Sequence, residues 1–420
     1  MQFTKLTTMP ALRVLPTLPP LLALLIAAGA ANHARATEWR GLFDVRAVGA
    51  DAPRGFLEGG LGKTRSERGV QLGQAVLHGN VDVTDTIAAT LELSADDRHD
   101  GVVDVREAWL TWRPLPTGAW KTRVKAGFFF PPTSVEIDYD GIGWTPRRTI
   151  SSSAINSWIG EELRTNGVEW SARRLGRHVG AAYDVGFVAA IFNGNDPTGT
   201  LLAWRGWSIS DRIAGRNEAF EMADLPVYRA DGDIWRQSRT LRPFRELDGK
   251  PGYYAGANLN VGTLLEVAGL HYDNRSDPEV FKHGQYGWRT RFDHVSAVLR
   301  PHGDWEVLMQ AMRGDTLMNW DLVELDFQSW YALLSHPVGA GTLALRYDRF
   351  RTSERDKLTN DPNNERGYGV ALAYDWPLSG QWSLMTEALL VRSERAARLQ
   401  IGEAPTQTER SITASLRWRF

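Results

Sequence analysis

The final ten residues, Ser411 to Phe420, constrain the fold more than any other stretch of the chain. Apolar side chains alternate with polar and cationic ones, and successive side chains of a strand point to opposite faces. One face carries Ile412, Ala414, Leu416, Trp418 and Phe420, and the other carries Thr413, Ser415, Arg417 and Arg419. Because termini usually fray, such a strand favours a closed barrel whose last strand pairs with its first. The last strand of a soluble β-sandwich is the alternative for this stretch alone.

The N-terminal segment has the three parts of a secretory signal peptide. Lys5 and Arg13 supply positive charge, residues 21–31 form a short apolar run, and Ala34-Arg35-Ala36 fits a cleavage site. We expect residues 1–36 to be a signal peptide and residues 37–420 to form one outer-membrane β-barrel. A retained N-terminal anchor is the alternative, although the run is short for a span of about 20 residues.

Composition narrows the classes of protein that fit. After residue 36 no stretch is apolar enough for a transmembrane helix, and only helices and closed barrels can span lipid. The chain has no cysteine, which excludes a small disulfide scaffold. Its 48 basic and 50 acidic residues nearly balance, which argues against a nucleic-acid-binding protein.

Alternating segments recur along the rest of the chain and predict a transmembrane antiparallel up-and-down β-barrel of about sixteen strands, with fourteen and eighteen as alternatives. The strands are predicted at 39–49, 70–83, 86–94, 102–113, 120–128, 163–173, 177–191, 252–260, 263–273, 286–300, 305–315, 322–336, 342–352, 366–376, 381–395 and 409–420. Short turns alternate with long polar loops, as periplasmic turns and extracellular loops do in outer-membrane barrels. Tryptophans beside the short turns suit a membrane interface: Trp39, Trp112, Trp120, Trp305, Trp376, Trp382 and Trp418.

The polar faces of these strands predict a wet interior, because cations on the lipid side cost about 2–4 kcal/mol each at mid-bilayer. Lys121, Arg123 and Lys125 on one strand are the clearest case. The inward charges expected on this basis are Glu92, Glu107, Lys121, Arg123, Lys125, Arg289, Arg291, Asp293, Glu306, Glu324, Asp326, Glu387, Arg417 and Arg419. Any one of them could equally form a structural ion pair. Rings of charge set ion selectivity in pores, so we expect a weak anion preference.

Two long connections, residues 131–160 and 193–250, are candidates for a loop that folds into the barrel and narrows it. The first leads from the cationic strand through Arg147 and Arg148 to Glu162 and Arg164, which complete the predicted pore lining. Ser151 to Trp158 could line a constriction with hydroxyls or cap a helix beginning near Ser153.

In layout the chain resembles bacterial outer-membrane porins, through its signal, even strand count, terminal Phe and size. Within them it is similar to the phosphate-selective (O/P-type) group, through Gly127-Phe-Phe-Phe-Pro-Pro132 and the basic strand before it. Lysine is scarce, so the lysine-rich phosphate site of that group is not evident. The resemblance implies a water-filled channel for small hydrophilic solutes or phosphate-like anions.

The resemblance also implies a location in the bacterial outer membrane, surrounded by lipid and lipopolysaccharide. Trp418 and Phe420 would be read by the barrel-assembly machinery, and a homotrimer is the oligomeric state common among such porins.

A barrel enzyme of the lipid-hydrolase type is the main alternative function. His78, His271, His294 and His336 fall on or beside predicted strands, but Gly-x-Ser-x-Gly and metal-binding motifs are absent from the sequence. We therefore expect no enzymatic activity, no metal and no cofactor. A soluble exported β-sandwich that binds a ligand is the third reading, and it predicts solubility without detergent.

Overall fold

A computed structural model describes residues 37–96, 103–116, 118–137, 142, 144–320, 322–356 and 358–420. The predicted signal peptide and most of the predicted loop tip at 96–101 lie outside these residues. No helix within the described ranges is long and apolar enough to cross a membrane.

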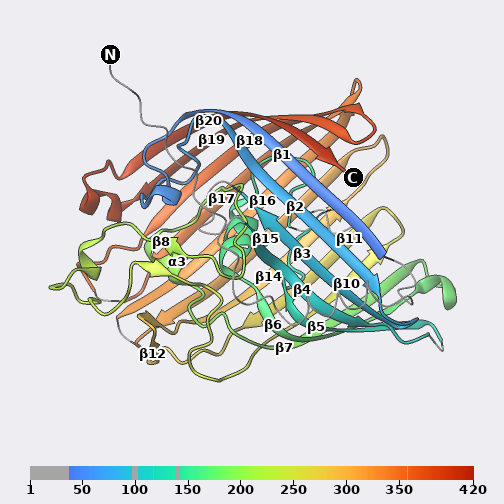
Figure 1. Cartoon of the computed structure of the whole chain (residues 1–420), viewed down its shortest axis with the longest axis horizontal. Helices are drawn as coiled ribbons and strands as arrows, with labels where there is room; N and C mark the ends of the chain where they lie inside the picture. The colour runs from blue at the N-terminus through green and yellow to red at the C-terminus, as the bar shows by residue number, and fades with distance from the viewer. Residues whose placement is uncertain are drawn as a thin grey trace, which may run out of the picture.

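Sixteen strands of the described chain form one closed antiparallel barrel, in which each pairs with its neighbours in chain order (Figure 1). The predicted fold and strand number are confirmed. The strands are β1 (Thr37–Asp51), β2 (Gly69–Asp82), β3 (Ile87–Ala95), β4 (Asp104–Trp112), β5 (Trp120–Phe129), β6 (Thr165–Arg174), β7 (Tyr183–Asn193), β10 (Gly252–Val261), β11 (Leu265–Asp273), β14 (Arg289–Leu299), β15 (Glu306–Met318), β16 (Val323–Val338), β17 (Gly341–Glu354), β18 (Glu365–Ser379), β19 (Trp382–Arg395) and β20 (Thr406–Arg419).

Short elements occupy the connections. Two helices, α2 (Ala154–Glu162) and α3 (Thr200–Trp204), lie in the two longest. Two small hairpins, β8 (Phe220–Glu221) with β9 (Thr240–Leu241) and β12 (Phe281–Lys282) with β13 (Gln285–Tyr286), lie on the long-loop side (Figure 1). Short 3-10 helices are η1 (Phe56–Glu58), η2 (Gly176–His178), η3 (Pro226–Tyr228) and η4 (Ala396–Ile401). The start predicted for β7 at residue 177 is wrong, because η2 and the left-handed Gly180 (φ 71°) turn the chain there.

The barrel closes between β1 and β20, where Phe43 lies opposite Trp418. The Gly41 amide donates to the Phe420 carbonyl at 3.0 Å, and the Phe420 amide donates back to the Gly41 carbonyl at 3.2 Å. The Phe420 ring covers Gly41 so closely that a Cβ there would lie 2.1 Å from it. The terminal aromatic residue therefore completes the seam, and its ring packs on the backbone of Gly41, where a side chain would displace it.

Large apolar side chains cover much of the outer wall, as a membrane requires. Large apolar side chains are exposed on it, for example Ile412 at 70% and Val295 at 55%. Most of the predicted interface tryptophans are also exposed at strand ends beside short turns, and Trp382 stacks on Trp418 with ring centroids 6.1 Å apart. These features suit a surface that faces lipid with an aromatic girdle at one interface.

The interior departs from the expectation of a wide polar lumen. The described residues of the segments 130–164 and 194–251 fold into the barrel and bury Trp144, Trp158, Trp204 and Trp207 almost completely. We call these two segments the plug. The inner faces of the later strands are apolar where they meet it: Phe292 of β14 and Phe327 of β16 contact Trp158, with centroids 5.7 and 5.2 Å away. The barrel is too wide for its own side chains to fill, so the long loops supply a core.

Candidate channel lumen and constriction

The inner face of β5 is the cationic wall that the sequence predicted. Lys121 and Arg123 are exposed on it, and half of the Arg123 side chain is accessible. Arg123 and the more buried Lys125 each lie 3.4 Å from the Glu169 carboxylate of β6. Lys121 has no ion-pair partner among the described residues. This wall therefore carries net positive charge, part of it on exposed side chains of the inner face.

Other cations continue this wall toward the plug. Arg173 of β6 pairs with Asp184 at 2.7 Å and stays half exposed. Arg148 lies 3.2 Å from Glu306, which Arg300 also approaches at 3.1 Å. Arg147 lies beside them and donates to the Val135 carbonyl at 3.3 Å. We define the cationic vestibule as this set: Lys121, Arg123, Arg147, Arg148, Arg173 and Arg300.

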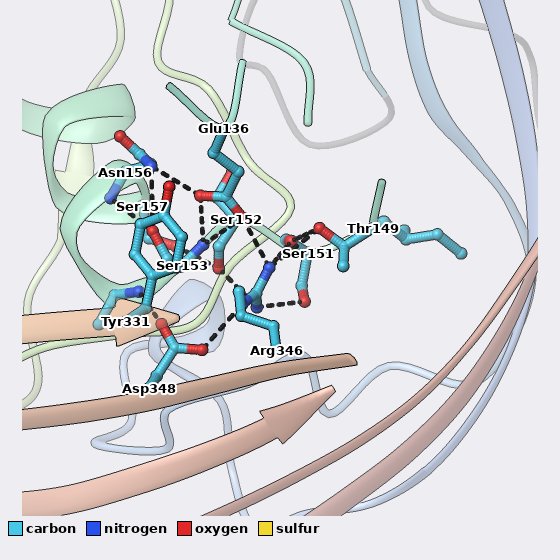
Figure 2. A network of polar contacts seen from close by, with 12 residues as sticks. Glu136, Thr149, Ser151, Ser152, Ser153, Asn156, Ser157, Tyr331, Arg346 and Asp348 are labelled. Carbon is cyan, nitrogen blue, oxygen red and sulfur yellow. Dashed lines mark hydrogen bonds and ion pairs between the residues drawn. The ribbon is translucent and has the colours of Figure 1, made fainter. Parts of the chain in front are cut away.

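A buried arginine of β17 anchors the plug to the opposite wall. Arg346 is fully buried and lies 2.7 Å from Glu136 and 2.8 Å from Asp348 (Figure 2). Its guanidinium also donates to the Ser151 carbonyl at 2.6 Å and the Thr149 hydroxyl at 2.9 Å. Charged hydrogen bonds with fixed geometry hold a chain segment in one position, so the plug is tied to the barrel here.

The carboxylates around Arg346 bind the backbone of the plug. Asp348 accepts from the Ala154 amide at 3.0 Å, and Glu136 accepts from the Ser153 amide at 3.0 and 3.1 Å. Glu387 of β19 accepts from the Ile150 amide at 2.9 Å. These amides lie at or before the start of α2, where a helix leaves N–H groups unpaired. Of the two readings of Ser151 to Trp158, the helix that begins near Ser153 is confirmed, because the Ser153 side chain caps α2.

Two predicted lining residues lie inside the plug. Glu162 is buried, and accepts from the Trp158 indole at 2.5 Å and the Leu201 amide at 3.0 Å. Burial raises the pKa of Glu162 to about 7. The Arg164 guanidinium lies 3.5 Å from the centre of the Phe130 ring and donates to carbonyls of the plug, including that of Gly160 at 3.3 Å. Both residues hold the plug together and do not face open water.

Arg417 points inward but is buried at the closing seam, 3.5 Å from Asp44 of β1. Asp44 also pairs with Arg46 at 2.7 Å, and Arg46 reaches Asp211 of the plug. This second buried network joins the seam to the plug. Arg417 is therefore part of the wall rather than of an exposed pore lining.

The expectation that Arg289 and Arg291 face the lumen is wrong. Phe292 and Thr290 of β14 face the plug, so the alternate residues point outward. Arg291 pairs with Asp315 of β15 on this outer face at 2.8 Å. The same correction applies to Asp293, Glu324 and Asp326, which lie on the outer side. The prediction places these charged side chains in a water-filled interior. The plug instead fills that part of the interior with apolar side chains, so the apolar faces of the strands turn inward.

Sequence reasoning missed the anchors Arg346, Asp348 and Glu136. A signal for the first two was present, because Leu343, Leu345 and Tyr347 alternate with them along β17. Placing the three apolar residues in lipid turns Arg346 and Asp348 inward. Nothing local to Glu136 indicates that it meets a strand more than two hundred residues away.

One acidic group could be considered for a metal. The group consists of three carboxylates, each with one oxygen within 4.8 Å of an oxygen of the other two: Asp196, Glu246 and Asp248. Burial and the neighbouring acids raise the pKa of Asp196 to about 7. Its carboxylate already accepts from the amides of Leu247 and Asp248. These hydrogen bonds explain why the three carboxylates lie close together, because Asp196 holds the two ends of the 194–251 segment to each other.

Comparison with known proteins shows which other proteins share this fold. No protein-family model and no curated protein sequence matches the chain. The anion-selective porin from Comamonas acidovorans superposes with a TM-score of 0.51 at 12% identity, over 92% of this chain and 99% of that one. The outer membrane channel DcaP of Acinetobacter baumannii gives 0.53 at 9% identity, over 91% and 97%. The chain thus has the fold of outer-membrane porins, in agreement with the predicted location in a bacterial outer membrane.

Proposed function

We propose that this protein is a non-enzymatic porin through which small hydrophilic solutes diffuse passively, with a preference for anions. The observation that carries the proposal is the cationic vestibule on one side of a narrowed barrel. Its basic side chains outnumber the acids that pair with them, and Lys121 and Arg123 are exposed. Fixed charge on a narrow wet wall raises the local concentration of the opposite ion.

The solute path runs along the inner faces of β5, β6 and β7 in this proposal. Inner residues of β17 to β20 are mostly covered by the plug, for example Arg346, Glu387 and Ser415. Inner residues on the opposite wall keep more exposure, for example Arg123 at 50% and Arg173 at 49% of the side chain. The plug would therefore act as the constriction, and the vestibule would select the ion.

The test is conductance of the purified mature protein in a planar bilayer under a KCl gradient. We expect open channels and a reversal potential shifted from zero toward the equilibrium potential of chloride. The Lys121→Gln, Arg123→Gln double variant should move that potential toward zero, because it removes exposed charge without touching the plug. Arg410→Gln, on the outer face of β20 and 63% exposed, is the matched control and should leave the potential unchanged.

Absence of conductance from folded protein, or clear potassium selectivity, would refute the proposal. Similarity to the phosphate-selective group suggests a second measurement. Millimolar inorganic phosphate should reduce the chloride current of the parent, and it should reduce the current of the double variant to a smaller extent. Release of fatty acid from phospholipid by the same preparation would support the alternative enzyme. A homotrimer stays a prediction, to be checked by the mass of the detergent-solubilised particle.

A further inference from the structure

Three accessible arginines of the 194–251 segment gather around a phenylalanine on the long-loop side of the barrel. Arg216 and Arg242 are exposed, and Arg245 and Phe244 are partly exposed. The Arg242 guanidinium donates to the carbonyl of Asn217, the residue after Arg216, at 2.9 Å. No carboxylate of the described residues lies within ion-pair distance of any of the three arginines. We call the three arginines and Phe244 the arginine rim.

The arginine rim lies at the loop-side ends of strands whose inner faces carry the cationic vestibule. The Arg216 amide donates to the carbonyl of Val105, near the start of β4, at 2.8 Å. The amide of Gly194, directly after β7, donates to the Glu246 carboxylate next to Arg245 at 2.8 Å. An anion held at the rim would therefore stand at the entrance to the proposed solute path along β5 to β7.

Aromatic rings alternate with the guanidinium groups here. The Phe128 and Phe244 rings meet edge to face, with centroids 5.5 Å apart. The Arg216 guanidinium lies 5.1 Å from the centre of the Phe128 ring, and the buried Arg164 lies 5.1 Å from that of Phe244. Phe128 is buried, so Phe244 is the ring of this pair that water reaches. The rim thus presents planar cations beside an accessible aromatic surface.

The positive charges of the rim lie close together and lack a paired acid. Burial and the neighbouring Arg242 lower the pKa of Arg245 below its ordinary value. Two acids on the adjoining segments, Asp104 and Glu246, are engaged elsewhere, since each accepts from a backbone amide at 2.8 Å. Fixed charge of one sign raises the local concentration of the opposite ion, so the rim attracts anions.

We propose that the arginine rim binds the carboxylate of a small aromatic solute, with the carboxylate on Arg216 and Arg242 and the ring against Phe244. Arginine holds a carboxylate through two parallel hydrogen bonds, and planar groups stack on aromatic rings, so one solute uses both features. Inorganic phosphate would use the charge and leave the accessible Phe244 ring in water. Binding depends on the rim alone, whereas capture of the solute before entry rests on the proposed channel function.

Calorimetric titration of the mature protein in detergent with benzoate tests the binding. Benzoate should bind the parent about tenfold more tightly than acetate, because its ring buries apolar surface against Phe244. The Arg216→Gln, Arg242→Gln variant should bind benzoate about tenfold more weakly, because charge-assisted hydrogen bonds are lost. Arg229→Gln is the matched control and should bind like the parent, since this half-exposed arginine of the same segment pairs with Asp224 at 3.3 Å.

Two further variants separate the parts of the site. Phe244→Leu should weaken the binding of benzoate and leave that of acetate unchanged. The lumen variant Lys121→Gln, Arg123→Gln should keep the preference for benzoate, because the rim is intact. Folding is checked by heat-modifiable gel mobility. If Arg216→Gln, Arg242→Gln does not fold, Arg216→Lys, Arg242→Lys serves, with intermediate binding because the charge stays and the bidentate contact is lost.

Bilayer currents separate binding from its role. Benzoate added on the loop side should reduce the chloride current at a lower concentration than benzoate added on the turn side, and the Arg216→Gln, Arg242→Gln variant should abolish this difference. If folded protein binds benzoate as stated and carries no current, the channel function fails and the binding proposal stands. Equal binding of benzoate and acetate, equal binding of benzoate by the parent and this variant, or tighter binding of inorganic phosphate would overturn the binding proposal.

Discussion

Replacing Arg346 with methionine should release the plug without opening the barrel. The arginine is fully buried, and its loss leaves the Glu136 and Asp348 carboxylates without their cation. Removing one partner of a buried ion pair typically costs about 3–5 kcal/mol, because the remaining charge stays out of water. The loss of stability should be confined to the plug, since β17 keeps its backbone hydrogen bonds to β16 and β18.

Two measurements separate the plug from the barrel. Single-channel conductance should rise or become noisy in Arg346→Met, because residues 130–164 no longer stay fixed. Limited proteolysis should cut that segment faster, while heat-modifiable mobility shows the barrel intact. The exposed Arg410→Gln variant is the control for loss of an arginine and should behave like the parent.

A double-mutant cycle with Glu136→Gln tests the reasoning directly. If the pair acts as a unit, the double variant should be less destabilised than the sum of the single changes, with a coupling of about 1–3 kcal/mol. Unchanged conductance and proteolysis in Arg346→Met would refute the view that this network anchors the plug.

Three further predictions follow from the contacts. Gly41→Val should slow barrel closure, since a side chain there displaces the Phe420 ring from the seam; a longer-lived unfolded band on gels after refolding is the measurement. Ser153→Ala should weaken the start of α2 by about 1 kcal/mol and increase amide exchange at residues 154–157. Raising the pH from 5 to 8 should loosen the plug. The Glu162 pKa of about 7 lies above its unfolded value, so this stability is full at low pH and is lost as the buried carboxyl ionises. Glu162→Gln should reduce that pH dependence of amide exchange, with a part left to Asp196, whose pKa is also raised to about 7, and an equal dependence in both proteins would contradict the assignment.

The filled interior changes how such a barrel would select solutes if the proposed function holds. A sixteen-stranded barrel closed only by its wall would leave a wide aqueous pore. Here Trp158, Trp204 and Trp207 form an apolar core inside the wall, so two separate apolar surfaces exist, one toward lipid and one around the plug. Inward side chains that stay exposed include Arg123 of β5 and Arg173 of β6. In the proposed channel, selectivity would depend on a few exposed cations such as these rather than on the whole ring of inward charges.

The sequence by itself determined the barrel, because strand alternation and turn spacing are local properties that lipid outside the wall reinforces. It predicted all sixteen strands, the seam residue Phe420 and the cationic face of β5, and it offered the helix cap at Ser153 as one of two readings. Only the tertiary structure decided the interior. Whether a charge on β14 faced the lumen or the outside depended on what filled the lumen, and the filling comes from loops far away in the chain. Glu136 meets Arg346, and Phe327 meets Trp158, through contacts that no local periodicity encodes.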